Sequence, residues 1–157
     1  MVHKISPFLW YDNDAEEAAD LYVSIFGGSI VEKRLWGPGG PSPEGSLQSV
    51  TFEIDGREYQ AFNGGPGQMF TEAVSLFVTV DTQEELDAAW DRLLEGGGRP
   101  LACGWIKDKF GLDWQLVPAI LSELMVSPDR EVSGRVIKVM LDSIKFDFAE
   151  IRAAAEG

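Results

Sequence analysis

The sequence predicts an α+β fold in which two βαβββ modules turn their concave sheets toward each other across a cleft, followed by C-terminal helices. Three observations predict it: an internal repeat, strand-like and helix-like segments in the same order in both copies, and a helical pattern near the C-terminus. The 157 residues suit a single domain. We expect modules at residues 1–66 and 71–118 and a helical tail at 119–157.

The first part of the repeat is an apolar strand followed by an amphipathic helix. It joins SPFLWYDNDAEEAADLYVSIFGGS, which begins at Ser6, to VSLFVTVDTQEELDAAWDRLLEGGG, which begins at Val74. Tyr22 of the first helix corresponds to Trp90, 68 positions later. A shared order of strand, helix and aromatic position indicates duplicated modules.

The ends of both helices carry residues that cap helices. Asp14 and Thr82 are the expected N-caps, and each has a glutamate three residues later, at the spacing of a capping box. Glycines follow both helices, at 27–28 and 96–98, as expected at C-terminal ends.

Three strands are expected after each helix. DGREYQAFN and FGLDWQLVP share a glycine, then two residues, an aromatic and a glutamine, so that Gln60 corresponds to Gln115. The glycine- and proline-rich stretch GPGGPSPEG predicts a flexible loop in the first module. The expected strands lie at about residues 4–11, 29–36, 46–54 and 57–63 in the first module, and 74–80, 99–103, 105–109 and 113–117 in the second.

The tail after Pro118 has a helical pattern. PAILSELMV, SPDREVSGRVIKVMLDS and FDFAEIRAAAE predict two or three helices, and the second carries an apolar stripe at Val132, Val136, Val139 and Met140. The stripe either packs into the core or helps to pair two chains. Together with a glycine-rich segment at 63–71, it leads us to expect a two-fold homodimer.

Composition excludes several classes of partner. A net charge of −13 disfavours nucleic acid and anionic membranes, and no apolar run is long enough to cross a bilayer. We see no signal peptide, and a single cysteine is typical of a reducing compartment, so we expect a cytoplasmic protein. Neither glycine-rich stretch has a phosphate-binding spacing, and we expect no nucleotide or other cofactor.

Four stretches resemble one known family: KISPFLWYDNDAEEAADLY, FNGGPG, CGWIKDKFGLDWQLVP and the helical tail. They are similar to the PhnB-like branch, labelled 3-demethylubiquinone methyltransferase-like, of the vicinal-oxygen-chelate superfamily of glyoxalases, extradiol dioxygenases and bleomycin- and fosfomycin-resistance proteins. The resemblance covers nearly the whole chain and implies paired βαβββ modules.

Relatives of this kind hold a divalent metal on the first and last strands of each module. The resemblance places those positions at Pro7, Gln60, Ser75 and Gln115. Proline offers no side-chain ligand, and hydroxyl and amide oxygens are weak ligands for a transition metal. We therefore expect no metal there. Gln115 and Gln60 either contact a ligand or bond backbone groups and water inside the cleft.

Strand alternation extends this set into a candidate site. Phe8, Trp10, Tyr59, Leu76, Val78, Trp114 and Leu116 are expected beneath the helices. Asp113 and Glu58 stand two residues before the glutamines and either edge the cleft or lie on the surface. We expect Cys103 to be a small apolar residue before a turn, and His3 to be solvated.

The expected ligand-binding residues, with Thr79 on the same face, are Pro7, Leu9, Tyr11, Trp36, Gln60, Phe62, Ser75, Phe77, Trp105, Phe110 and Gln115.

The apolar, aromatic lining favours a protein that binds a small apolar or aromatic molecule of unknown identity, as resistance-type relatives do. Two alternatives remain open. The protein is a lyase- or dioxygenase-like enzyme of the same superfamily with an atypical site, or a structural or partner-binding domain whose aromatics fill the cleft.

Overall fold

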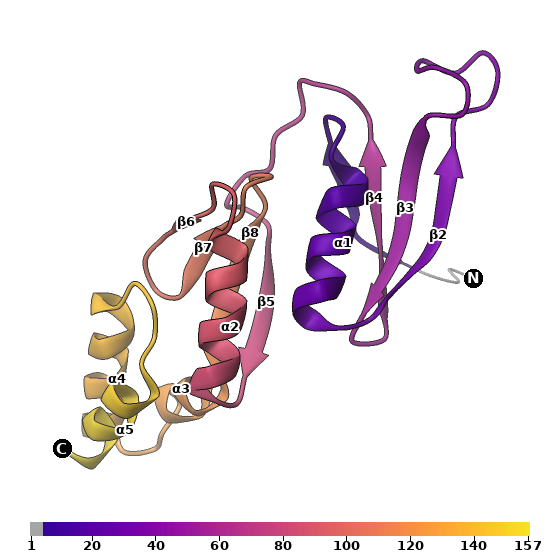
Figure 1. The fold of residues 1–157 in the computed structure, drawn as a ribbon. Coiled ribbons are helices and arrows are strands. Elements are labelled where there is room, and N and C mark those ends of the chain that lie inside the picture. Colours follow the sequence, from indigo (N-terminus) through magenta and orange to yellow (C-terminus); the bar gives the residue numbers. More distant parts are fainter. Residues whose placement is uncertain (1–4) are drawn as a thin grey trace. The chain divides into compact units, whose positions relative to one another are not determined.

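The computed structural model describes residues 5–157 and divides the chain into two compact units, the first ending at Phe70 and the second running from Thr71 to Gly157. Each unit contains a four-stranded sheet, as expected for an α+β protein (Figure 1). No helix within the described residues is both long and apolar enough to cross a membrane.

The first unit has the predicted βαβββ order. Its elements are β1 (Phe8–Tyr11), α1 (Ala15–Phe26), β2 (Ser29–Leu35), β3 (Leu47–Ile54) and β4 (Arg57–Asn63). The strands lie in the order β1-β4-β3-β2, with β1 parallel to β4 and the other neighbours antiparallel. Helix α1 covers one face of this sheet, leaving the other face without a helix (Figure 1).

The second unit repeats this topology. Its elements are β5 (Ser75–Val80), α2 (Gln83–Leu94), β6 (Arg99–Pro100), β7 (Trp105–Lys107) and β8 (Asp113–Pro118), with the sheet order β5-β8-β7-β6. Strands β6 and β7 are shorter than predicted. The chain turns after β7, where the buried Asp108 side chain accepts hydrogen bonds from backbone N–H groups of the turn. The β7–β8 ladder therefore ends at Lys107 and does not reach residue 109.

The tail forms three helices: α3 (Ala119–Met125), α4 (Arg130–Asp142) and α5 (Phe148–Glu156). Val136 is fully buried, because α4 packs against α3 and α5. Arg135 donates hydrogen bonds to the carbonyls of Ala154 and Ala155, at the end of α5 where carbonyls lack helical partners. Of the apolar stripe, Val136 is buried within the tail, while Val132, Val139 and Met140 are half-buried.

A strap at residues 143–148 attaches the tail to the rest of the second unit. The backbone N–H groups of residues 103 and 104 donate to the carbonyls of residues 143 and 144, at 2.8 and 2.9 Å. Gln83 on α2 donates to the Phe146 carbonyl and accepts from the Phe148 N–H. A Cβ on Gly104 would lie 2.3 Å from the buried Phe146 ring, so this turn needs a glycine where the strap crosses it.

The first helix is not capped as the sequence predicts. Asp14 makes no side-chain cap, and the Ala15 N–H donates instead to Oδ1 of Asn63, at 2.9 Å. The predicted cap of the second helix is confirmed, because the Thr82 side chain accepts a hydrogen bond from the Glu85 N–H. A cap supplied by a residue 48 positions away leaves no local sequence signal.

The predicted orientation of β1 is wrong. Leu9 and Tyr11 face α1, where the Tyr11 and Tyr22 hydroxyls share a 3.2 Å hydrogen bond, while Phe8 lies on the uncovered face with 55% of its surface exposed. Three residues connect β1 to α1, but two connect β5 to α2. The helices are therefore 68 positions apart and the strands 69, and one residue of slippage exchanges the faces of a strand.

Candidate functional site

A serine and a glutamine meet at equivalent places in the two sheets. Nε2 of Gln60 donates to Oγ of Ser6 at 3.4 Å, and Nε2 of Gln115 donates to Oγ of Ser75 at 2.8 Å. Each glutamine lies beside a phenylalanine of the first strand, Phe8 or Phe77, in the parallel ladder. The two Ser–Gln pairs are therefore the same structural feature in duplicate.

Ser6 takes the place that the sequence comparison gave to Pro7. The Pro7 ring is exposed, and its carbonyl accepts the Gln60 N–H at 3.0 Å as a backbone partner. The signal that identifies Ser6 is the shared motif Ser-x-Phe, SPF and SLF, 69 positions apart. Alignment on the helices hid it.

The uncovered face of the first sheet carries an aromatic cluster centred on Phe62. The ring centroids of Phe8, Trp10 and Trp36 lie 5.3, 5.0 and 6.0 Å from that of Phe62. Trp36 Nε1 is buried and has no hydrogen-bond partner within residues 5–157. Trp36 and Phe62, both predicted for the site, therefore lie together, and Trp10 joins them instead of packing under α1.

The glycines after β4 accommodate this cluster. A Cβ on Gly64 would lie 2.1 Å from the Trp10 indole, and Trp10 Nε1 donates to the Gly65 carbonyl at 2.9 Å. The FNGGPG stretch thus has a packing role, with its glycines beside an indole and its asparagine at the start of α1.

The uncovered face of the second sheet has the orientation expected from the sequence. Phe77, Gln115 and Trp105 form one row across the strands, and Phe77 is 58% exposed. Thr79 is also exposed on this face. Trp114 and Leu116 are buried on the opposite, helix-covered face.

The turn at residues 108–112 explains much of the GWIKDKFGLDWQ stretch. Asp108 is buried and accepts hydrogen bonds from the Phe110 and Leu112 N–H groups and from Trp114 Nε1, all at 2.9–3.0 Å. Phe110, a predicted site residue, therefore lies in a turn whose backbone is fixed by Asp108. Phe110 thus lies between β7 and β8, and its contact with a ligand stays a prediction.

A charged pair forms the second row of the same uncovered face. Lys107 Nζ lies 2.6 Å from Oδ2 of Asp113, and their side chains are 16% and 0% exposed. The other Asp113 oxygen, Oδ1, is buried and accepts no hydrogen bond from the described part of the chain. Glu58, the corresponding residue of the first sheet, lies opposite Glu53.

Comparison with known proteins identifies the family. A family model described as 3-demethylubiquinone-9 3-methyltransferase matches residues 3–117. The chain belongs to this family. It is a member of the PhnB-like branch of the vicinal-oxygen-chelate superfamily. None of the curated proteins compared with it matches.

Solved structures of similar proteins agree with the fold. The PhnB protein of Bacillus cereus is 34% identical over 74% of this chain and 100% of its own, with a TM-score of 0.67. Protein PA1353 of Pseudomonas aeruginosa is 20% identical, over 74% and 98% of the two chains, with a TM-score of 0.61. Fosfomycin resistance protein FosX of Mesorhizobium loti shares the fold at 14% identity, over 81% and 100%, with a TM-score of 0.56.

The PhnB-like family match does not extend over the helical tail. It ends at residue 117, and the Bacillus cereus protein is matched over its full length by 74% of this chain. The expectation that the resemblance covers nearly the whole chain was therefore wrong. Helices α3 to α5 lie beyond the matched residues and form part of the second unit.

The residues at the positions where the resemblance implies metal ligands, with Ser6 in the place given to Pro7, do not fit a divalent metal. Ser6, Gln60, Ser75 and Gln115 are neutral, and each glutamine amide already donates to its serine. Within residues 5–157, no three His, Cys, Asp or Glu side chains gather into a possible metal site. The histidine, His3, lies outside the described residues.

Cys103 lies in the turn that precedes β7. It has a left-handed φ of +58°, and its N–H is bonded to the Ser143 carbonyl of the strap. Its thiol forms no disulfide. The sequence placed Cys103 before a turn, whereas the structure places it within the turn.

Proposed function

We propose that the protein binds a small apolar or aromatic molecule on the uncovered faces of its sheets, and that the Ser–Gln pairs make polar contacts to it. One observation carries the proposal: each face exposes a phenylalanine, Phe8 or Phe77, beside a Ser–Gln pair at equivalent positions. That combination supplies an apolar surface together with a polar group of fixed orientation.

Exposure of these rings has a free-energy cost that a ligand would remove. Covering apolar surface contributes about 25 cal/mol per Å², and aromatic rings add favourable edge-to-face contacts with other rings. Phe62 and the rings around it provide such contacts on the first sheet.

The second candidate is an enzyme of the same superfamily with an atypical site. The Lys107–Asp113 pair favours it, because acid–base chemistry needs an ionisable group beside the bound molecule. Turnover of a bound compound would distinguish an enzyme from a binding protein. A third candidate, a partner-binding domain, is distinguished by a polypeptide covering Phe8 and Phe77 in place of a small molecule.

The test combines a small-molecule melting screen with Gln115→Leu. We expect aromatic compounds to raise the melting temperature of the native protein and Gln115→Leu to abolish that rise, because the variant loses the amide but keeps a similar volume. Gln68→Leu, at an exposed position, is the control. A loss of folding stability above roughly 2 kcal/mol in Gln115→Leu would instead assign the amide a structural role.

A further inference from the structure

The Lys107–Asp113 pair contains a buried acceptor that nothing in the described chain satisfies. Oδ2 of Asp113 receives the Lys107 ammonium at 2.6 Å, but Oδ1 has no donor although the side chain is fully buried. Buried polar atoms are almost always hydrogen-bonded, because leaving one unpaired forfeits its hydration. An exception is therefore a candidate for contact with a bound molecule.

The position of the pair associates it with the proposed ligand face. Lys107 and Asp113 are partners in the antiparallel ladder, one row from Trp105 and Gln115, so all four residues point away from α2. Asp113 and Gln115 are about 7 Å apart along β8, as expected for residues two apart on a strand. Lys107 also donates to the Gly111 carbonyl, at 3.4 Å. It is the partly exposed member of the pair.

The duplicated architecture does not require this pair. The first sheet has two glutamates, Glu53 and Glu58, at the corresponding ladder positions. A module of this kind therefore forms its sheet without a buried ion pair. Because replacing a buried ion pair by apolar residues is often neutral or stabilising, stability alone gives little reason for the pair to be present.

Charge restricts what the free oxygen can accept. An anionic ligand would be repelled by the Asp113 carboxylate, and a cationic ligand would lose its hydration at a buried site whose charge Lys107 already balances. A neutral O–H or N–H group meets neither penalty and supplies the donor that Oδ1 lacks.

We propose that Asp113 Oδ1 accepts a hydrogen bond from a neutral hydroxyl or amide N–H group on the bound molecule. The ligand class is thus an aromatic or apolar body carrying one neutral donor, such as a phenol. This inference rests on the proposed function, since it names the polar group of the same ligand.

The test compares two probes that differ only in the donor, p-cresol and 4-methylanisole, by calorimetric titration of the full chain. The native protein is expected to prefer p-cresol by at least roughly tenfold, because a hydrogen bond to a charged acceptor is stronger than a neutral one. In the double variant Lys107→Met/Asp113→Leu the two affinities should become nearly equal. The control, Lys138→Met/Asp142→Leu, removes an exposed ion pair on α4 and should keep the preference.

Asp113→Asn is a second variant for the case in which the double variant does not fold. Its neutral amide oxygen accepts a weaker hydrogen bond, so the preference for p-cresol should fall several-fold. Equal affinities in the native protein, or an unchanged preference in a folded variant, would overturn this inference and leave the proposed function standing. If neither probe binds the native protein, both proposals are wrong.

Discussion

At the scale of single residues, Asn63 joins three segments of the first unit. Its Oδ1 accepts the Ala15 N–H at the start of α1, and its Nδ2 donates to the Leu47 carbonyl at the start of β3. It is itself the last residue of β4 and is buried. One amide therefore satisfies both a helix end and a strand end, which a carboxylate could not do because it has no donor.

Asn63→Ala should lower the free energy of unfolding by about 1–2 kcal/mol, because it removes a helix cap and leaves the half-buried Leu47 carbonyl without its donor. Asp14→Ala is the matched control and should change it by less than about 0.5 kcal/mol, since the Asp14 side chain caps nothing. Urea denaturation measures both. A larger loss for Asp14→Ala would mean that the cap is local after all.

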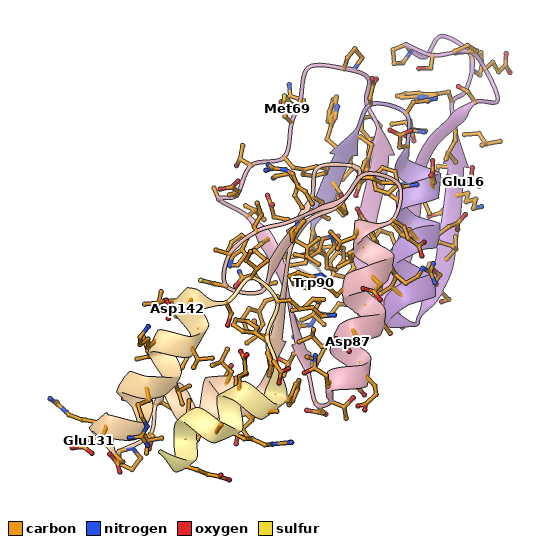
Figure 2. All side chains as sticks on the ribbon, turned by 60° about the vertical axis from the view of Figure 1, so that its left-hand side comes forward. Glu16, Met69, Asp87, Trp90, Glu131 and Asp142 are labelled. Atoms are coloured by element: carbon orange, nitrogen blue, oxygen red, sulfur yellow. The ribbon has the colours of Figure 1, made fainter. Side chains whose placement is uncertain are left out.

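At the scale of elements, the strap connects the added helices to α2. Beyond the bonds from Gln83, the Lys145 ammonium lies 2.6 Å from Asp87 and 5.8 Å from the centre of the Trp90 ring. Both Asp87 and Trp90 belong to α2 (Figure 2). The hydrogen bond from Lys145 lowers the pKa of the Asp87 carboxyl. The contact therefore stabilises the folded protein at pH values above the pKa that Asp87 has in the unfolded chain. This stabilisation is lost as the pH falls through the lower pKa that Asp87 has in the folded protein. Because both side chains are partly exposed, solvent screening keeps the effect small.

Gln83→Ala should loosen the strap, because one side chain makes hydrogen bonds to both Phe146 and Phe148. We expect a loss of about 1–2 kcal/mol in unfolding free energy and faster amide hydrogen exchange at Phe148. Gln68→Ala, on an exposed loop, should change neither. Unchanged exchange at Phe148 would show that the strap is held by its backbone bonds alone.

At the scale of the whole molecule, the neutral Ser–Gln pairs lead to a prediction about metal content. Purified protein should contain well below one equivalent of zinc, nickel or manganese after dialysis, because hydroxyl and amide oxygens compete poorly with water for these ions. Elemental analysis and melting curves with each added metal check this. One bound metal per chain, lost on changing Gln60 or Gln115, would falsify the prediction.

The assembly of chains is a second prediction at this scale. We propose a two-fold dimer, because β1, β2, β5 and β6 are sheet edges and unpaired edges invite association. Strand β2 also exposes Val31 and Leu35. Light scattering behind a sizing column should give twice the 17.3 kDa chain mass. A mass of one chain at micromolar concentration would rule the dimer out.

The sequence alone determined the duplicated βαβββ order, most strand and helix ranges, and the correspondence of Gln60 to Gln115 in the repeat. These follow from local signals: alternation of apolar residues, glycines at helix ends, and a repeated aromatic–glutamine motif. The orientation of the second sheet followed correctly from Gln115 and Ser75.

Only the tertiary structure decided which face of β1 is uncovered, which residue pairs with Gln60, and what caps α1. One extra residue between β1 and α1 shifts the strand against the helix, so a repeat aligned on helices assigns Pro7 the place of Ser6 and reverses Leu9 and Tyr11. The cap from Asn63 and the free Asp113 oxygen depend on contacts between strands and helices distant in sequence. Local patterns carry periodicity, but the register between elements is set by packing, where a single residue exchanges the faces of a strand.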